Sequence, residues 1–213
     1  MTLAQRMNTY ALWLGYADET SSPDPFSGTP LLFIALLVRE SHSLRSLIRR
    51  AYKKSGRRLG GSGELKAAFS THQLIQDVLT RLSHLEVEIV CVTLDKSVIV
   101  RPPDDPEILY LTTASRLFRR CVERHPRLEI HFDKRYTSKF QSRMFERYLR
   151  EEISDLSGTI VTVEQDDSVA LKELQAADFV AWAAGQRTRG NDTFWQIIAH
   201  RVVLDEVIRR EKW

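Results

Sequence analysis

Short apolar runs alternate along the chain with segments in which apolar residues recur every three or four positions. The first run, residues 10–19, is almost continuously apolar until it ends at Asp18 and Glu19. Strands that are covered on both faces lose the apolar–polar alternation, so this run predicts a buried central strand. Because successive strand side chains point to opposite faces, Asp18 shares a face with Leu14 and Tyr16. A carboxylate there must be solvated, paired or bound to a metal, because an isolated buried charge is very costly.

The remaining pattern predicts four further strands and six helices. The predicted strands are apolar runs rich in β-branched residues, at 31–38, 88–95, 128–133 and 158–163. The predicted helices have apolar residues at helical spacing, at 43–54, 71–83, 110–122, 140–153, 171–186 and 193–210. Residues 64–69 predict a short strand or a helix start. A turn-rich loop alone joins the first two strands, which favours an antiparallel pair. The later alternation predicts an α/β fold with a mixed central sheet flanked by helices.

Composition narrows the class of protein. A chain of 213 residues with 43% hydrophobic and 28% charged residues suits a single globular domain over 1–213. No window holds the roughly 18 uncharged apolar residues of a membrane span, and no signal peptide is evident. We therefore expect a cytoplasmic protein without a membrane partner. Cys91 and Cys121 are expected to be buried apolar residues rather than a disulfide or a zinc site. The oligomeric state does not follow from the sequence.

Positive charge is concentrated in one place although the net charge is only +3. Six basic residues fall within ten positions that contain no acid, and they are Arg49, Arg50, Lys53, Lys54, Arg57 and Arg58. Lysine and arginine are favoured at helix C-termini, so a solvated helix end explains this basic cluster. A surface that faces the phosphates of a nucleic acid explains it equally well.

Three predicted strands end in an aspartate, at Asp18, Asp95 and Asp133, and the helix at 171–186 carries Asp178 on a semi-buried face. Open α/β sheets bind ligands outside the carboxyl ends of their strands. Convergent carboxylates suit Mg²⁺ or Mn²⁺ rather than zinc. Two such ions would activate a water and stabilise the leaving oxygen in phosphodiester cleavage. For a single strand-end aspartate, a turn or a helix cap is the simpler explanation.

Other catalytic classes lack their motifs in this sequence. The six histidines show no His-x-x-x-His or Cys-His ligand spacing, which argues against a zinc site. The glycines at 60, 61 and 63 are not followed by the Lys-Ser/Thr of a phosphate-binding loop, and no Gly-x-Ser-x-Gly elbow occurs. His131 shares a strand face with Asp133 and could act on a proton, although a hydrogen-bonded structural histidine explains it better.

Several short motifs together resemble the family named domain of unknown function 3800. The motifs are Ala17-Asp18-Glu19, Glu64-Leu65-Lys66, Leu94-Asp95-Lys96, Asp133-Lys134-Arg135, and Ser168 followed by Leu174-Gln175-Ala176-Ala177-Asp178-Phe179. The resemblance extends from about residue 10 to residue 188. That family resembles ribonuclease H in fold. It usually continues Asp-Glu with Ser-Gly, whereas Thr20-Ser21-Ser22 follows here, so the first turn differs.

The resemblance implies a set of acidic metal ligands and catalytic residues. These roles fall on Asp18, Glu64, Asp95 and Asp178, with Asp133 as the rival or partner of Asp95. Glu19 and Gln175 are implied to orient the ligands from behind. Lys66, Lys96 and Arg135 are implied phosphate contacts.

The sequence therefore predicts a ribonuclease H-like domain with two-metal nuclease activity on DNA or RNA, using Mg²⁺ or Mn²⁺. A module that keeps the fold and binds nucleic acid or a protein partner without hydrolysis is the first alternative. A hydrolase of small phosphorylated molecules is the second.

Overall fold

The computed structural model describes residues 11–55 and 64–213. Within these residues the chain forms a mixed six-stranded sheet in the order β5-β4-β1-β2-β3-β6. The strands are β1 (Trp13–Thr20), β2 (Leu31–Val38), β3 (Glu88–Leu94), β4 (Arg127–Asp133), β5 (Ile160–Asp166) and β6 (Val202–Ile208). β2 is antiparallel to both of its neighbours, and the other neighbouring strands are parallel. The α/β class, the mixed sheet and the antiparallel first pair are confirmed.

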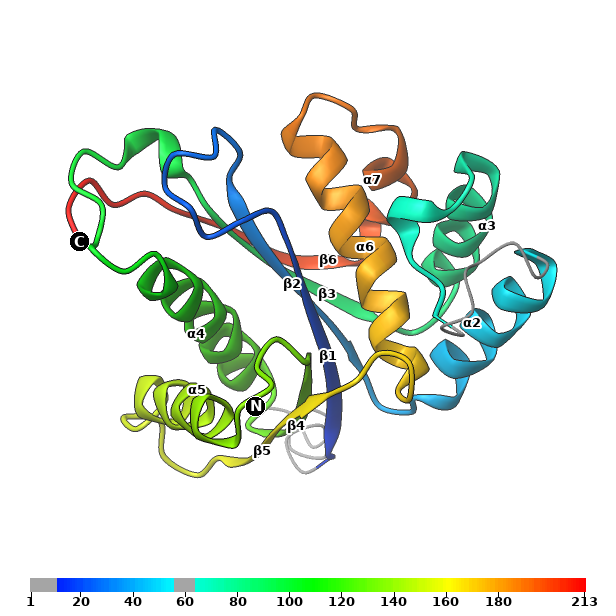
Figure 1. Ribbon diagram of the computed structural model, residues 1–213. Helices are drawn as coiled ribbons and strands as arrows, with labels where there is room; N and C mark the ends of the chain where they lie inside the picture. Colours follow the sequence, from blue (N-terminus) through cyan, green and yellow to red (C-terminus); the bar gives the residue numbers. More distant parts are fainter. Residues whose placement is uncertain (1–10, 56–63) are drawn as a thin grey trace.

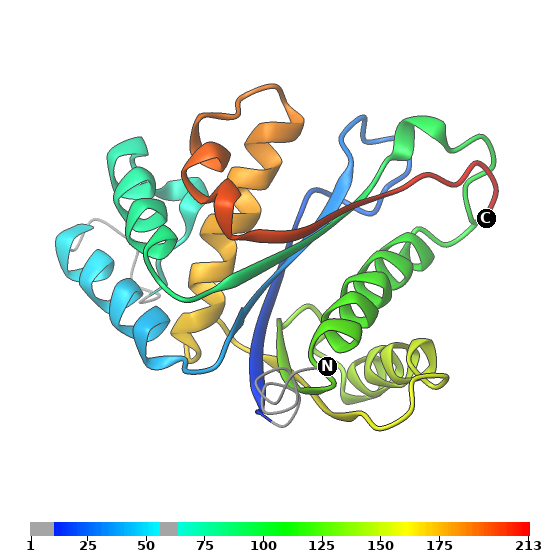
Figure 2. The same cartoon turned by 180° about the vertical axis from the view of Figure 1, so that it is seen from behind.

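Helices cover both faces of the sheet (Figures 1 and 2). The first face carries α2 (His42–Ser55), α3 (His72–Ser83), α6 (Lys172–Thr188) and α7 (Thr193–Ile198). The second face carries α4 (Glu107–Arg124) and α5 (Lys139–Glu152). Three short 3₁₀ helices are η2 (Ala67–Phe69), η3 (Lys96–Val98) and η4 (Ala199–Arg201). None of the helices in the described ranges has the length and apolarity that crossing a membrane requires.

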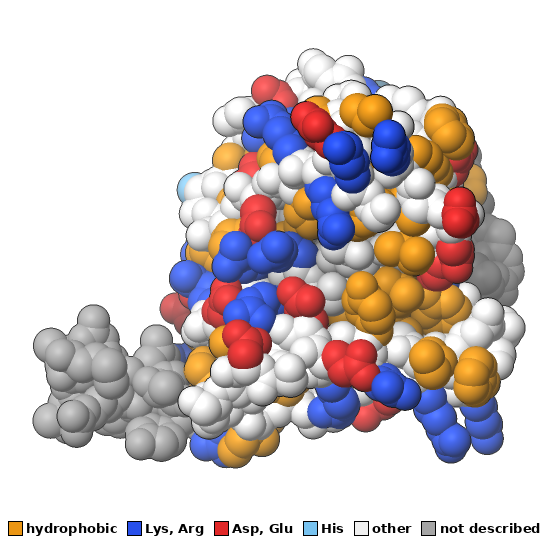
Figure 3. All heavy atoms as spheres, turned by 90° about the vertical axis from the view of Figure 1, so that its left-hand side faces the viewer, with side chains coloured by type: hydrophobic (Ala, Val, Ile, Leu, Met, Phe, Trp, Pro, Cys, Tyr) orange, Lys and Arg blue, Asp and Glu red, His pale blue; other side chains and the backbone are white. Residues whose placement is uncertain are grey.

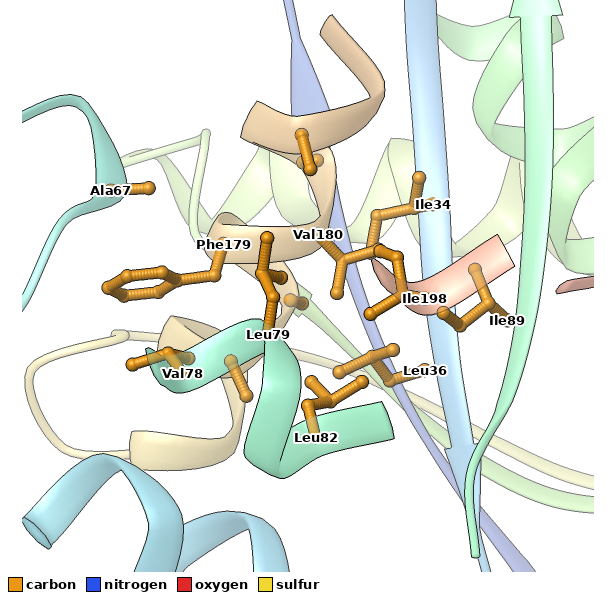
Figure 4. Packing of buried hydrophobic residues seen from close by; sticks show 14 of the residues in the cluster. Ile34, Leu36, Ala67, Val78, Leu79, Leu82, Ile89, Phe179, Val180 and Ile198 are labelled. Atoms are coloured by element: carbon orange, nitrogen blue, oxygen red, sulfur yellow. The ribbon is translucent and has the colours of Figure 1, made fainter. Parts of the chain in front are cut away.

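β2 separates two hydrophobic clusters, which explains why all eight of its residues are buried. Its even-numbered side chains pack with α2, α3 and α6, and its odd-numbered side chains pack with α4 and α5. Figure 4 shows Ile34 and Leu36 of β2 facing the apolar side chains of α3 and α6. Cys91 and Cys121 are free, buried and in opposite clusters, as expected for apolar core residues.

α6 lies close to β1 because its sheet-facing side chains are small. Ala177, Ala181 and Ala184 are buried in the first cluster. At Gly185 an added Cβ would lie 3.1 Å from both Cγ2 and Oγ1 of Thr20. The C-terminal half of α6 is thereby held against the end of β1.

Replacing Gly185 with leucine is expected to destabilise the protein by about 1–3 kcal/mol, the usual cost of overpacking. The loss occurs even though leucine is the better helix former. Urea unfolding of Gly185→Leu and of the double variant Gly185→Leu/Thr20→Ala measures it. The second change removes the two contacting atoms, so part of the stability should return. A double variant no more stable than Gly185→Leu would show that contact with Thr20 does not limit this site.

The prediction of one final helix at 193–210 is wrong. α7 ends at Ile198, a single 3₁₀ turn follows, and Val202–Ile208 forms β6, which pairs in parallel with β3 at one end of the sheet. Val202, Val203, Val207 and Ile208 are β-branched and favour a strand. Pairing also satisfies backbone groups of β3 that would otherwise lie at a sheet edge. The strand at 158–163 is consequently not the last one, and it is found at Ile160–Asp166.

Candidate functional site

β1 ends at the carboxylate around which the other acids gather. Tyr16 packs toward α6, so Asp18, two residues further along the strand, faces α6 as well. Its Oδ1 accepts the backbone N–H of Glu19 at 2.8 Å. Burial raises the pKa of Asp18 well above its ordinary value, and the negative charges of Glu19, Asp178 and Asp133 raise it further. Asp18 is therefore a partly buried acid with three like charges near it.

Asp133 comes from the strand beside β1. β4 runs parallel to β1, and their pairing reaches Ala17 and Phe132, the residues just before Asp18 and Asp133. The odd-numbered residues of β4 point toward α6, because Phe132 and its even-numbered neighbours belong to the opposite cluster. Oδ1 of Asp133 accepts the backbone N–H of Lys134 at 3.0 Å. Burial raises the pKa of Asp133, and this outweighs the lowering by hydrogen bonds and by Lys66.

α6 supplies the third carboxylate, Asp178. Its Oδ2 accepts the backbone N–H of Ala67 at 2.6 Å, which ties α6 to η2. Burial raises the pKa of Asp178 to about 6, against the lowering by Ala67 and Lys66, and Glu64 and Asp133 add to the rise. The helical face that the sequence assigned to Asp178 therefore does turn toward the strand ends.

Glu64 approaches from the segment that leads into η2. Its Oε1 accepts the hydroxyl of Ser168 at 2.6 Å, and the ammonium of Lys66 lies 3.2 Å from the same oxygen. Gln175 of α6 is buried, accepts the backbone N–H of Leu65 at 3.1 Å and donates to the carbonyl of Ser168 at 2.6 Å. Gln175 thus fastens the segment of Glu64 to the loop of Ser168.

Glu19 extends the acidic group to the other side of β1. The hydroxyl of Tyr110 donates to its Oε2 at 3.4 Å, and Arg135 lies 3.9 Å from its Oε1. The guanidinium of Arg135 also lies over the ring of Tyr110, 4.0 Å from its centroid. Burial raises the pKa of Glu19 to about 7, opposed by Arg135 and Tyr110 and assisted by Asp133. The guanidinium of Arg135 thus already contacts Glu19 and Tyr110 within the protein.

The donor chemistry of this site fits a hard divalent cation. We call Asp18, Glu64, Asp133 and Asp178, with Glu19 behind them, the acid site. It contains oxygen donors only, and three of the carboxylates have pKa values raised in part by the negative charges of the others. In the described ranges, however, no three Asp, Glu, His or Cys side chains are spaced to hold a metal ion. Carboxylate oxygens of Asp18, Asp178 and Glu64 instead bond protein donors. Metal binding would require these side chains to turn toward one another.

Asp95 lies apart from this group, and the strand register explains why. Asp18 is in register with Ile34, and Ile34 with Cys91. Asp95 follows Cys91 by four residues on a strand two places away from β1, which corresponds to roughly 13 Å along the strands and roughly 10 Å across them. Its carboxylate accepts the backbone N–H and hydroxyl of Ser97, capping η3, and lies 3.5 Å from Arg209. The structure brings Asp133, not Asp95, beside Asp18 and Asp178.

Lys96 is bonded within the protein rather than open to solvent. Its side chain is buried, and its ammonium donates to the carbonyls of Ser22 and Asp24 and to the hydroxyl of Ser27. These three bonds use all the protons of the ammonium. Lys96 thus fixes the loop between β1 and β2, which argues against its predicted contact with phosphate.

The described part of the basic cluster lies on α2, which packs against α6 and α3 on the sheet face of Asp18. Arg49, Arg50 and Lys53 are exposed, and Lys54 lies 3.2 Å from Asp77 of α3. Arg57 and Arg58 lie outside the described residues. Contact between this cluster and nucleic acid stays a prediction.

Two contributors to the acid site had no role predicted from the sequence. Ser168 was part of a motif but had no function assigned, and it bonds Glu64 and the Gln175 amide. Tyr110 lies on α4, on the far face of the sheet, and reaches Glu19. The signal available for Tyr110 in the sequence was its hydroxyl group among the apolar residues of one helix face. His131 bonds Asp166 and Glu129 and stacks on Tyr16, in agreement with a structural histidine.

Comparison with known proteins identifies the fold. A chain of the PCNA:RNase HII complex from Archaeoglobus fulgidus superposes with a TM-score of 0.54 and 13% identity, over 84% of this chain and 75% of that one. Bst-RNase HIII in complex with Mn²⁺ superposes with a TM-score of 0.51 and 16% identity, over 87% of this chain and 55% of that one. No family model matches the sequence, and no curated protein matches it. The resemblance to domain of unknown function 3800 is thus unconfirmed.

These similarities show a ribonuclease H-like fold. At such low identity they establish the architecture and not the chemistry. The second of these proteins was solved with Mn²⁺ bound.

Proposed function

We propose that this ribonuclease H-like chain is a divalent-metal-dependent phosphodiesterase that cleaves nucleic acid by a two-metal mechanism. One observation carries the proposal: Asp18, Asp133, Asp178 and Glu64 come from four separate segments to one end of β1 and β4, where three of them have raised pKa values. Grouping partly buried acids is costly for a fold without a cation to bind. The sequence motifs support placing the chain, as a single domain, in the family named domain of unknown function 3800.

The proposed roles follow from where each side chain lies. Asp18 and Asp133 would hold the cations from the sheet, and Asp178 and Glu64 from the opposite side. Mg²⁺ or Mn²⁺ bound there would supply an activated water and stabilise the departing oxygen. Lys66 pairs with Glu64 but is partly exposed, so its ammonium can contact a substrate phosphate.

Groups behind the carboxylates hold in place the segments that carry them. Gln175 ties the Glu64 segment to the loop of Ser168, and the Ala67 N–H fixes Asp178. Arg135 and Tyr110 hold Glu19 from the other face of the sheet. Losing such a partner typically costs roughly 10- to 100-fold in metal affinity or activity. We further propose that the basic cluster, Arg49 to Arg58, contacts the phosphates of the substrate.

A matched pair of variants tests the site. Asp133→Asn should abolish Mn²⁺-dependent cleavage, because it removes a charged ligand, whereas Asp95→Asn should leave cleavage near the wild-type rate. Asparagine is a good helix cap, so the second change also keeps the turn at η3. Cleavage is measured on labelled single-stranded and duplex DNA, RNA and hybrid oligonucleotides, with melting curves confirming that both variants fold.

Three outcomes would contradict the proposal in different ways. Equal losses in the two variants would mean that the acid site is not the centre of the chemistry. Oligonucleotide binding without cleavage of any substrate by the wild type would favour a non-catalytic binding module. Turnover of nucleotides or phosphate esters alone would favour a hydrolase of small phosphorylated molecules.

A further inference from the structure

η2 is anchored at one end and exposed at the other. Ala67 is buried against the cluster that contains Phe179 and Val78 (Figure 4), and its N–H bonds Asp178. Two residues later, Phe69 has 80% of its surface exposed. The same 3₁₀ turn therefore fixes a carboxylate of the acid site and presents a phenyl ring to solvent.

Phe69 borders a hollow between the end of α2 and the start of α3. The hollow has a volume of about 330 Å³, and its described lining includes Lys54, Phe69, Ser70, Thr71, Gln73 and Leu74. Its wall combines an aromatic face, an aliphatic side chain, hydroxyl and amide groups, and one ammonium. This combination suits a flat heterocycle that has polar edges and an attached phosphate.

We propose that this hollow receives an unstacked base of a single-stranded nucleic acid, with Phe69 as the stacking surface. The inference rests on the proposed function and names its substrate class. Aromatic side chains stack on bases of any sequence, because every base has a π-face. A base inside a duplex has both faces covered by its neighbours, so only a single strand or an unstacked end can use Phe69.

Lys54 supplies the charge that a strand in this position needs. Its ammonium lies 3.2 Å from Asp77, and its side chain is 59% exposed. An exposed ion pair of this kind contributes little to stability, so a phosphate can replace Asp77 as the partner of Lys54. Phosphate contacts by lysine dominate the affinity of nucleic-acid binding and make it sensitive to salt.

The hollow is close enough to the acid site for both to engage one strand. Consecutive Cα atoms are about 3.8 Å apart, so the Cα of Phe69 lies within about 7.6 Å of that of Ala67. The Ala67 N–H is in turn 2.6 Å from Oδ2 of Asp178. A strand whose base stacks on Phe69 can therefore place a nearby phosphate at Asp178, and Lys66 directly precedes Ala67 in the chain.

Fluorescence anisotropy of a labelled oligothymidylate and a labelled oligouridylate tests the proposal, with calcium in place of manganese so that binding is followed without cleavage. Phe69→Ala should weaken binding to single strands by roughly 5- to 150-fold, the usual range for losing one stacked base. Phe69→Trp should keep the affinity, and its indole fluorescence should be quenched on binding. Lys54→Ala should flatten the dependence of log affinity on log salt by about 0.7. Binding to a blunt duplex should not change in Phe69→Ala.

Phe140→Ala is the matched control, because Phe140 is another exposed phenylalanine, 72% exposed, on α5 at the opposite face of the sheet. In Figure 3, which views the left-hand side of Figure 1, Lys and Arg side chains alternate with Asp and Glu and form no continuous basic surface. Phe140→Ala should bind like the wild type. Equal affinities of wild type and Phe69→Ala, an equal loss in Phe140→Ala, or no binding by the wild type would overturn the proposal.

The test separates this inference from the proposed function. Binding in calcium does not require turnover, so a loss confined to Phe69→Ala supports the hollow even if manganese gives no cleavage. Conversely, cleavage that depends on Asp133 but not on Phe69 would support the proposed phosphodiesterase activity. It would also show that the hollow does not bind the substrate.

Discussion

Asp18→Asn is expected to abolish metal-dependent cleavage while raising the melting temperature of the metal-free protein. Asparagine keeps the shape of the side chain but removes the charge that would hold a cation. The loss of activity should exceed the roughly 10- to 100-fold typical of removing a group behind a ligand. The gain in stability follows because burial raises the pKa of the wild-type carboxyl, and the negative charges of Glu19, Asp178 and Asp133 raise it further. Asparagine resembles the protonated acid and escapes that repulsion.

Melting curves with and without manganese measure both effects. A ligand that binds only the folded state stabilises it by about 2.7 kcal/mol at a concentration one hundred times its Kd. Wild type should show this shift and Asp18→Asn should not. Asp104→Asn, at an exposed position before α4, is the control and should respond like wild type. If manganese stabilises Asp18→Asn as much as wild type, Asp18 is not a ligand.

The second large effect is expected at an ion pair that holds α2 to α6. Nε and a terminal nitrogen of Arg45 lie 2.9 Å and 2.8 Å from Oε1 of Glu173. The Glu173 side chain is fully buried, and Arg45 is 44% exposed. Arg45→Ala leaves the carboxylate buried without its partner, which costs about 3–5 kcal/mol in a fully buried pair. Because solvent screens Arg45, we expect about 2–3 kcal/mol here.

A double-mutant cycle measures this interaction by urea unfolding. Glu173→Gln removes the charge that is left behind, so the double variant Arg45→Ala/Glu173→Gln should be more stable than Arg45→Ala alone. Arg49→Ala, exposed on the same helix, should stay within about 0.5 kcal/mol of wild type. Strictly additive losses in the double variant would show that the two side chains do not interact energetically.

The local pattern of apolar and polar residues was sufficient to predict elements at the centre of the fold. It was insufficient to predict the strand at one edge of the sheet. β2 was found at its observed bounds because both of its faces are buried, and α6 because its small and polar residues recur at helical spacing. β6 was missed since Ile197, Ile198, Val202 and Leu204 also fit a helix. Pairing with β3, a tertiary contact, decides the structure of this segment.

The acid site shows the same division. Asp18 and Asp178 were identified from the strand end and the helix face. The choice between Asp95 and Asp133 depends on strand order and register, which place β4 beside β1 and β3 two strands away. Neither the strand order nor the register can be read from the local sequence. The Arg45–Glu173 pair joins residues 128 positions apart and had no signal in the sequence.

The long separations within the acid site also determine when it can form during folding. The β1–β2 hairpin closes a short loop, whereas the Ala67–Asp178 bond spans 111 residues and the Glu64–Ser168 bond spans 104. Contacts between distant residues pay a larger loop-closure entropy and form slowly. A nascent chain whose α6 segment has not yet emerged from the ribosome has no assembled acid site, even if its β1–β2 hairpin has formed. Any hydrolytic activity of this protein is therefore confined to chains that have completed folding through α6.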